Sequence, residues 1–101
     1  MFDNNKTITL NGVVEEFQWT NPHSHLVVKV RDAKGGAQAW MVETSSPAQL
    51  TRRGWKRSSV KANDKIQVEI HPLRSGEPGG ALVNAIVNGK QIGTPQTLGQ
   101  N

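Results

Sequence analysis

Hydrophobic and polar residues alternate along most of the chain, which is the pattern of β-strands with one buried face. The alternation is clearest over Lys65–His71, where Ile66, Val68 and Ile70 share one face and polar residues occupy the other. The same pattern predicts strands over Thr7–Phe17, His25–Arg31, Ala37–Glu43 and Ala81–Val87, with a short return over Lys90–Ile92.

The first predicted strand changes its phase part of the way along. Ile8 and Leu10 share one parity, whereas Val13 and Phe17 have the other. Gly12 stands at the change, and a glycine inside a strand often marks a bulge or a sharp bend. We therefore predict that the strand bends at Gly12, so that both apolar sets point inward.

Helix signals gather in one segment between the third and fourth strands. Ser46 is a suitable N-cap, Pro47 fits the first helical position, and Gly54 is a typical residue just beyond a helix end. These residues predict a helix of about two turns over Pro47–Arg53. Turn residues predict a hairpin at 32–36, a loop at 73–80 and a tight turn at 88–89.

The order of these elements is three strands, a short helix and two further strands. This is the order of the OB-fold, a small five-stranded Greek-key barrel. We therefore predict an all-β barrel of five to six strands with one short helix between strands 3 and 4. The alternative is an open β-sandwich with the helix at one end. Residues 1–92 form one domain in this prediction, and residues 93–101 form a flexible tail because they lack apolar periodicity.

The amino-acid composition excludes several classes of functional site. The chain has 101 residues, no cysteine and a formal net charge of +4. Disulfides, thiolate catalysis and cysteine-based zinc sites are therefore excluded. No apolar run approaches the roughly 20 residues of a membrane-spanning helix, so we expect no membrane insertion. The first residues, Met1–Asn5, are polar and lack the apolar centre of a signal peptide.

The stretch Trp19–His25 combines an aromatic residue, the Asn21-Pro22 turn signal and two of the three histidines. Ligands of OB-folds tend to bind the face of strands 2 and 3, between the loop that joins strands 1 and 2 and the loop that joins strands 4 and 5. Here those loops are 18–24 and 72–80. We therefore predict a ligand site between segments 18–25 and 71–80, with five candidate ligand-binding residues: Trp19, Asn21, His23, His71 and Arg74.

Histidines in these segments raise the possibility of a metal site. Neutral imidazoles bind copper, nickel or zinc, and His23, His25 and His71 are the three candidates. In the plain alternative, His23 forms a hydrogen bond within the Asn-Pro turn while His25 and His71 are solvated at strand ends. We favour this alternative and expect no resident cofactor.

A basic segment suggests nucleic-acid binding as a further possibility. Six of the twelve Lys and Arg residues lie within 52–65, around Trp55. Such a patch could neutralise phosphates while the tryptophan stacks on a base. In the plain alternative, the basic face is solvated and Trp55 packs as a lid on the barrel end. We favour the lid, so nucleic acid is the disfavoured partner.

The sequence favours a non-enzymatic protein. Acidic residues such as Asp32, Asp64 and Glu69 fall at turns or strand surfaces and do not form an acid–base pair. Ser24 would point away from its neighbouring histidines in an extended chain. The glycines of 76–80 do not follow a strand and open a helix, so they do not indicate a phosphate loop.

Two motifs carry a resemblance to a known family. They are Asn21-Pro22-His23, within Lys6–Ser24, and the H-P-L-R-x-G-x-P-G-G string of His71–Gly80. With these motifs the chain resembles a bacterial domain-of-unknown-function family of small exported proteins. The resemblance implies a periplasmic or secreted protein after signal removal, with no established activity. It also implies that His25 lies outside the family motif. We expect a binding or accessory module for a small molecule, peptide or protein, as a monomer or weak homodimer.

Overall fold

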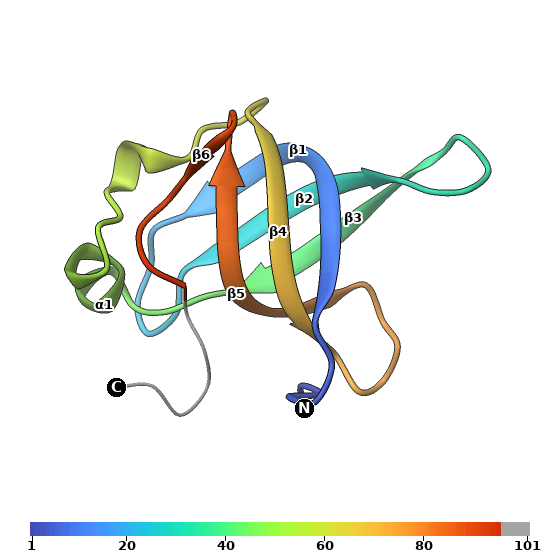
Figure 1. The fold of residues 1–101 in the computed structure, drawn as a ribbon, viewed down its shortest axis with the longest axis horizontal. Coiled ribbons are helices and arrows are strands. Elements are labelled where there is room, and N and C mark those ends of the chain that lie inside the picture. The colour runs from blue at the N-terminus through green and yellow to red at the C-terminus, as the bar shows by residue number, and fades with distance from the viewer. Residues whose placement is uncertain (96–101) are drawn as a thin grey trace.

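The structure, a computed structural model, describes residues 1–95. Within these residues, six strands form a single curled sheet (Figure 1). The strands are β1 (Ile8–Gln18), β2 (His25–Arg31), β3 (Ala37–Glu43), β4 (Lys65–Pro72), β5 (Gly79–Val87) and β6 (Lys90–Gln91). Between β3 and β4 lie the helix α1 (Pro47–Arg52) and the 3₁₀ turn η1 (Arg57–Ser59).

The sheet closes into a barrel because its first and fifth strands in space meet. The strand order is β3-β2-β1-β4-β5-β6, and β3 also pairs with β5. This closing pair is parallel and short, and it joins Met41–Glu43 to Gly79–Ala81. The predicted barrel, with its helix between the third and fourth strands, is therefore confirmed, and the open sandwich is not observed.

The core of the barrel follows the alternation of the sequence. Fully buried Leu26 and Val28 on β2 face Val42 on β3, while Val68 and Ile70 on β4 complete the same interior. Residues between them on each strand point outward, as a period of two requires. The interior is therefore filled by side chains, and binding surfaces must lie on the outside of the barrel or at its ends.

The bulge in β1 is not at Gly12, the position at which the sequence suggested a bulge or a bend. The pairing with β2 shifts between Val14 and Glu16, so the bulge lies at Glu15 and not at Gly12. Val14 is consequently buried, whereas Val13, predicted to point inward, is 40% exposed. Gly12 has a different role: a Cβ there would overlap the backbone carbonyl oxygen of Lys29. The glycine permits a close approach of two strands, and the bulge changes the phase.

Helix α1 and the segment after it cover one end of the barrel (Figure 1). The Ser46 hydroxyl accepts the N–H of Gln49 at 3.3 Å, which confirms the predicted N-cap. The helix ends at Arg52, one residue before the predicted end, since Arg53 is its C-cap. Leu50 is fully buried and Trp55 is only 1% exposed, with its ring centroid 5.9 Å from that of Phe17. Trp55 is therefore the lid of this end.

The predicted tail begins beside this lid. The N–H of Thr94 donates to the carbonyl of Arg53 at 3.1 Å, and the N–H of Ile92 donates to Ala85 at 2.9 Å. The part of the predicted tail from 96 to 101 lies outside the described residues.

Candidate functional site

Both loops of the predicted site reach the same strand, β3. In the β1–β2 loop, Nδ1 of His23 lies 3.1 Å from the carbonyl oxygen of Thr44, just beyond the end of β3. In the β4–β5 loop, the carbonyl of Pro78 accepts the N–H of Met41 at 3.2 Å. The outer surface of β3 from Met41 to Thr44 therefore lies between the two loops.

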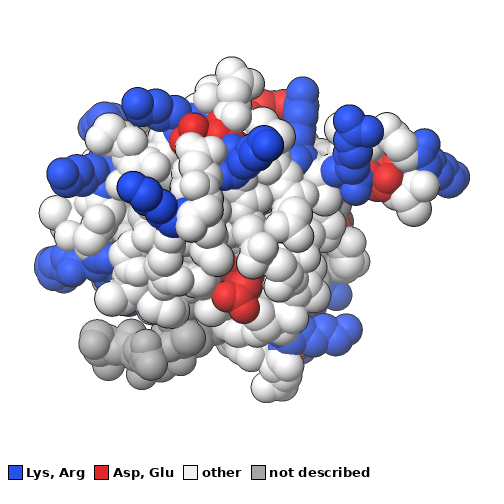
Figure 2. All heavy atoms as spheres, turned by 45° about the horizontal axis from the view of Figure 1, so that its top comes forward, with Lys and Arg blue, Asp and Glu red and all other residues white. Residues whose placement is uncertain are grey.

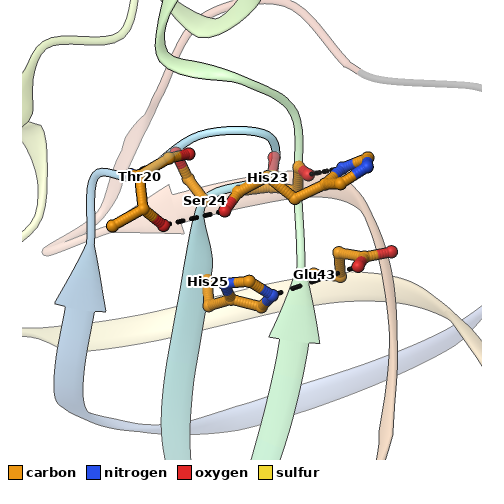
Figure 3. Close-up of polar contacts among 6 residues, drawn as sticks. Thr20, His23, Ser24, His25 and Glu43 are labelled. Atoms are coloured by element: carbon orange, nitrogen blue, oxygen red, sulfur yellow. Dashed lines mark hydrogen bonds and ion pairs between the residues drawn. The ribbon is translucent and has the colours of Figure 1, made fainter.

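The β1–β2 loop is held by short polar contacts (Figure 3). The Thr20 hydroxyl donates to the carbonyl of His23 at 2.8 Å, and the Thr20 N–H donates to the Ser24 hydroxyl at 3.3 Å. Ser24 is fully buried, and its backbone extends the pairing with the β3 side through Ser45 and Thr44. The turn contains a cis peptide bond between Asn21 and Pro22. The imidazole of His23 thus contacts a neighbouring segment and not the turn itself, unlike the plain alternative above.

Outward residues at the strand ends form a row around the barrel. His25 pairs with Glu43, Glu43 with Ala81, and Ala81 with His71 in the strand registers. Nε2 of His25 lies 3.9 Å from Oε1 of Glu43, and both side chains are half-buried (Figure 3). Along this row, the path from His25 to His71 crosses three strand spacings of the curved sheet.

The three histidines have different neighbours in the structure. Nδ1 of His71 lies 2.7 Å from the carbonyl oxygen of Lys6, while His25 faces Glu43. Among residues 1–95, no group of three or more His, Asp or Glu side chains is placed to hold a metal ion. The structure therefore does not assemble His23, His25 and His71 into one ligand set.

A second, apolar row runs beside the first. Val27 pairs with Met41, and Met41 pairs with Gly79. A Cβ on Gly79 would be 3.0 Å from Cδ1 of Leu73, so the Leu73 side chain lies over the glycine. Met41 is 52% exposed and lies in line with half-buried Val27 and Leu73. We name the two rows together the β3 patch: Val27, Met41 and Leu73 with His25, Glu43 and His71.

Three other predicted ligand-binding residues, Trp19, Asn21 and Arg74, are not members of the β3 patch. Trp19 is half-buried and stacks edge-on against Phe17, with ring centroids 5.9 Å apart, so it packs against the core. Asn21 is exposed on its loop, and Arg74 is exposed in the β4–β5 loop, where its N–H donates to the carbonyl of Met1 at 2.9 Å. Sequence reasoning missed Val27 and Met41, whose signal was apolar character at outward positions of their strands.

The basic segment 52–65 lies on the surface of α1 and of the turns after it. In Figure 2, Lys and Arg side chains outnumber acidic ones on the visible face. Trp55, however, is buried under the helix and against Phe17. Its indole cannot stack on a nucleobase without opening the barrel end, so this segment lacks the aromatic platform expected of a single-strand binding site.

Comparisons with known proteins identify a family and a fold. A family model described as "Family of unknown function (DUF6152)" matches residues 1–83. A solved structure, the mitochondrial single-stranded DNA binding protein Rim1 from S. cerevisiae, is similar with a TM-score of 0.58 and 10% sequence identity. The similarity covers 86% of this chain and 95% of that chain, and at this identity it shows the fold alone. No curated protein matches the chain. Among the described residues, no helix has the length and apolar character needed to cross a membrane.

Proposed function

This chain belongs to the DUF6152 family of unknown function, and we propose that it is a non-enzymatic binding module that holds an extended segment of a partner protein against the β3 patch. The observation that carries the proposal is the exposure of Met41 between two loops, in line with Val27 and Leu73. Exposed apolar side chains with a polar border are typical of protein-binding surfaces.

The open edge of β3 favours an extended partner. In an antiparallel ladder, residue pairs that exchange backbone hydrogen bonds alternate with pairs that do not. In the β2–β3 ladder, hydrogen bonds join Asp32 to Gly36 and Ser24 to Thr44. By this alternation, the backbone N–H and C=O groups of Ala37 and Ala39 point away from β2. β5 pairs only with Met41–Glu43, so among residues 1–95 no strand lies beside this stretch of β3 on the side away from β2. It is exposed and uncharged, whereas natural proteins usually protect such edges with charged residues or proline.

A strand added at this edge would lie beside Ala37–Ala39 and end before Met41, whose N–H already donates to the carbonyl of Pro78. Its backbone would pair with Ala37 and Ala39, and alternate side chains would reach the apolar row of the β3 patch. The pair of His25 and Glu43 at the end of the patch offers hydrogen-bonding groups to a polar side chain of the same segment.

Polar groups near the patch support a binding role over a catalytic one. Ser24, the hydroxyl nearest to the histidines in sequence, is fully buried and acts as a hydrogen-bond partner for the loop backbone. Oε1 of Glu43 lies 3.9 Å from Nε2 of His25. Among the described residues, these two side chains do not belong to a group of three or more His, Asp or Glu side chains that could hold a metal ion. We place the binding function in the periplasm or outside the cell, because the motifs of the sequence resemble an exported family.

Selection of peptides from a random library, followed by amide chemical-shift mapping, tests the proposal. We expect selected peptides to shift the amides of β3 from Ala37 to Glu43, and we expect Met41→Glu to abolish their binding by placing a charge in the apolar row. Val13→Glu is the matched control, since Val13 is also an exposed apolar strand residue and lies outside the β3 patch. Peptides that bind equally well to the Met41→Glu variant would refute the proposal.

Single-stranded nucleic acid is the second candidate ligand. It is favoured by the printed name of the similar structure, a single-stranded DNA binding protein, and by the net charge of +4. It is disfavoured by the burial of Trp55. Retention of a fluorescent single strand that falls steeply with salt would support this candidate, and the absence of retention at low salt would reject it.

A further inference from the structure

A groove crosses the outside of the barrel where β1 passes from one half of the sheet to the other. It has a volume of about 520 Å³, and its ten lining residues include Lys29, Arg31 and Lys65 but no acidic residue. This volume is in the range of small-ligand sites. The groove shares no residue with the β3 patch, and the two surfaces adjoin on β2, where Val27 of the patch and Lys29 of the groove are successive outward residues.

Strand registers place two of the cations on either side of one valine. Val13 pairs with Lys29 on β2 and with Lys65 on β4, so the three residues form a row across the sheet. Directly opposite side chains on neighbouring strands have Cβ atoms about 5 Å apart, which puts the two lysines about 10 Å apart. Arg31 follows Lys29 by two residues and so has the same outward direction.

The two carboxylates that adjoin these cations in sequence, Asp32 and Asp64, accept hydrogen bonds from neutral amide groups and form no ion pair with Arg31 or Lys65 among residues 1–95. Asp32, next to Arg31, accepts the N–H groups of Lys34 and Gly36 at 2.9 Å in the hairpin turn. Asp64, next to Lys65, accepts the N–H of Lys61 at 2.9 Å and the amide of Asn88 at 3.2 Å.

Lys29 alone of the three cations is paired, at 3.4 Å from Glu15, and this pair is exposed. Within residues 1–95, neither Arg31 nor Lys65 forms an ion pair. Arg31 and Lys65 therefore present positive charge to the groove without an ion-pair partner among residues 1–95.

Apolar groups form the rest of the wall. Val13 is 40% exposed between the lysines, and Ile86 lies across the groove from it. None of the residues that line the groove is aromatic, which disfavours a single strand held by base stacking. Three cations around an apolar surface instead match one doubly charged head group attached to an apolar body.

We propose that this groove is a binding site for a small organic phosphate, whose phosphate group is held by Arg31, Lys65 and Lys29 while its apolar part rests on Val13 and Ile86. The arginine offers a planar fork of donors, and each lysine offers a point charge. The site is independent of the partner-binding function proposed above and would stand if that function failed.

Titration of phenyl phosphate into the labelled full chain at low salt tests the site by amide chemical shifts. We expect saturable shifts at residues 11–13, 29–31 and 65–67, with tighter binding than inorganic phosphate, which lacks the apolar part. Arg31→Gln and Lys65→Gln should each weaken binding about tenfold, because each removes a hydrogen bond to a charged group. Lys6→Gln is the matched control, since it makes the same charge change outside the groove. Val13→Glu should abolish binding while the fold is retained, as circular dichroism would show.

Three results would overturn the proposal. Equal weakening by Lys6→Gln would reveal a response to net charge alone. Shifts that do not saturate, or that lie outside the groove, would show that the groove is not a site. A single-stranded oligonucleotide that binds far more tightly than phenyl phosphate, with the same loss in Lys65→Gln, would make the ligand a polymer. Vesicles that contain phosphatidic acid distinguish a lipid phosphate from a free organic phosphate. Vesicle binding that depends on Lys65 indicates a lipid phosphate. Binding of phenyl phosphate without binding of the vesicles indicates a free organic phosphate.

Discussion

Replacing Trp55 by alanine removes the side chain that closes one end of the barrel. The indole is 1% exposed, packs at 5.9 Å from the ring of Phe17 and lies in the same core cluster as Leu50. Truncation of a buried aromatic residue costs about 3–5 kcal/mol, and an aromatic pair adds about 1 kcal/mol beyond its buried area. Nε1 of the indole has no hydrogen-bond partner among the described residues, so no hydrogen bond is lost. We therefore expect the free energy of unfolding to fall by about 4 kcal/mol.

This loss is large for a domain of this size, whose total stability is about 5–15 kcal/mol. The melting temperature should fall by about 20 °C, since 1 kcal/mol corresponds to about 4–8 °C in a domain of roughly 100 residues. Urea unfolding followed by far-ultraviolet circular dichroism measures the change without relying on tryptophan fluorescence. Trp40→Ala is the matched control, because Trp40 is only partly buried on β3 and its loss should cost clearly less. A loss below about 1 kcal/mol for Trp55→Ala would refute the lid and make base stacking by Trp55 possible again.

Three further variants or conditions test particular parts of the structure. Gly12→Ala should destabilise the barrel by at least about 2 kcal/mol in urea unfolding, because its Cβ would overlap the backbone carbonyl of Lys29; a neutral effect would contradict the close approach of β1 and β2. Ser46→Ala should cost about 1 kcal/mol by loss of the N-cap, and Ser46→Asp should restore most of it; equal stability of all three proteins would show that the cap contributes nothing. A tenfold excess of zinc(II) should leave the melting temperature unchanged in thermal unfolding, since the three histidines form no common site; a rise that His23→Ala removes would revive a metal site.

Much of the architecture was predictable because strand alternation and turn residues are local signals. β2 and β3 begin and end where the sequence predicted them, and β4 extends only one residue further, to Pro72. The Ser46–Pro47 pair located the start of α1 for a similarly local reason. Closure of the barrel through β3 and β5 was predictable only from the order of elements, since the parallel pair is joined by residues about forty positions apart.

The sequence placed the bulge of β1 at the wrong residue. A glycine inside a strand can mark a bulge or a close approach of two backbones, and the sequence does not distinguish these two cases. A glycine at the phase change suggested the bulge at Gly12, yet the extra residue is Glu15. Alternation alone could not separate Val13 from Val14 as the inward residue, because both are apolar and adjacent. The contact with Lys29 that requires Gly12 joins residues from two strands, so it depends on register and not on local sequence.

Site residues were harder to predict for the same reason. The sequence drew attention to the two loops, and it ranked histidines and tryptophans above outward apolar residues. Trp19 packs against the core, and His71 contacts the backbone of Lys6, 65 positions away. The exposure of Met41 follows from its outward register beside Gly79, which leaves it without a neighbouring side chain on β5.

The bulge also explains why one small barrel can present two different outer surfaces. Because Glu15 is the extra residue, Val14 turns inward and Val13 turns outward, in line with Lys29 and Lys65. Without the bulge, β1 would present one uninterrupted outward set along its whole length, and Phe17 could not share the interior with Val14. β2 then contributes apolar Val27 to the β3 patch and, at the next outward position, Lys29 to the groove. Since these residues lie on one rigid strand with opposite chemistry, the two surfaces are best understood as separate sites for separate ligands.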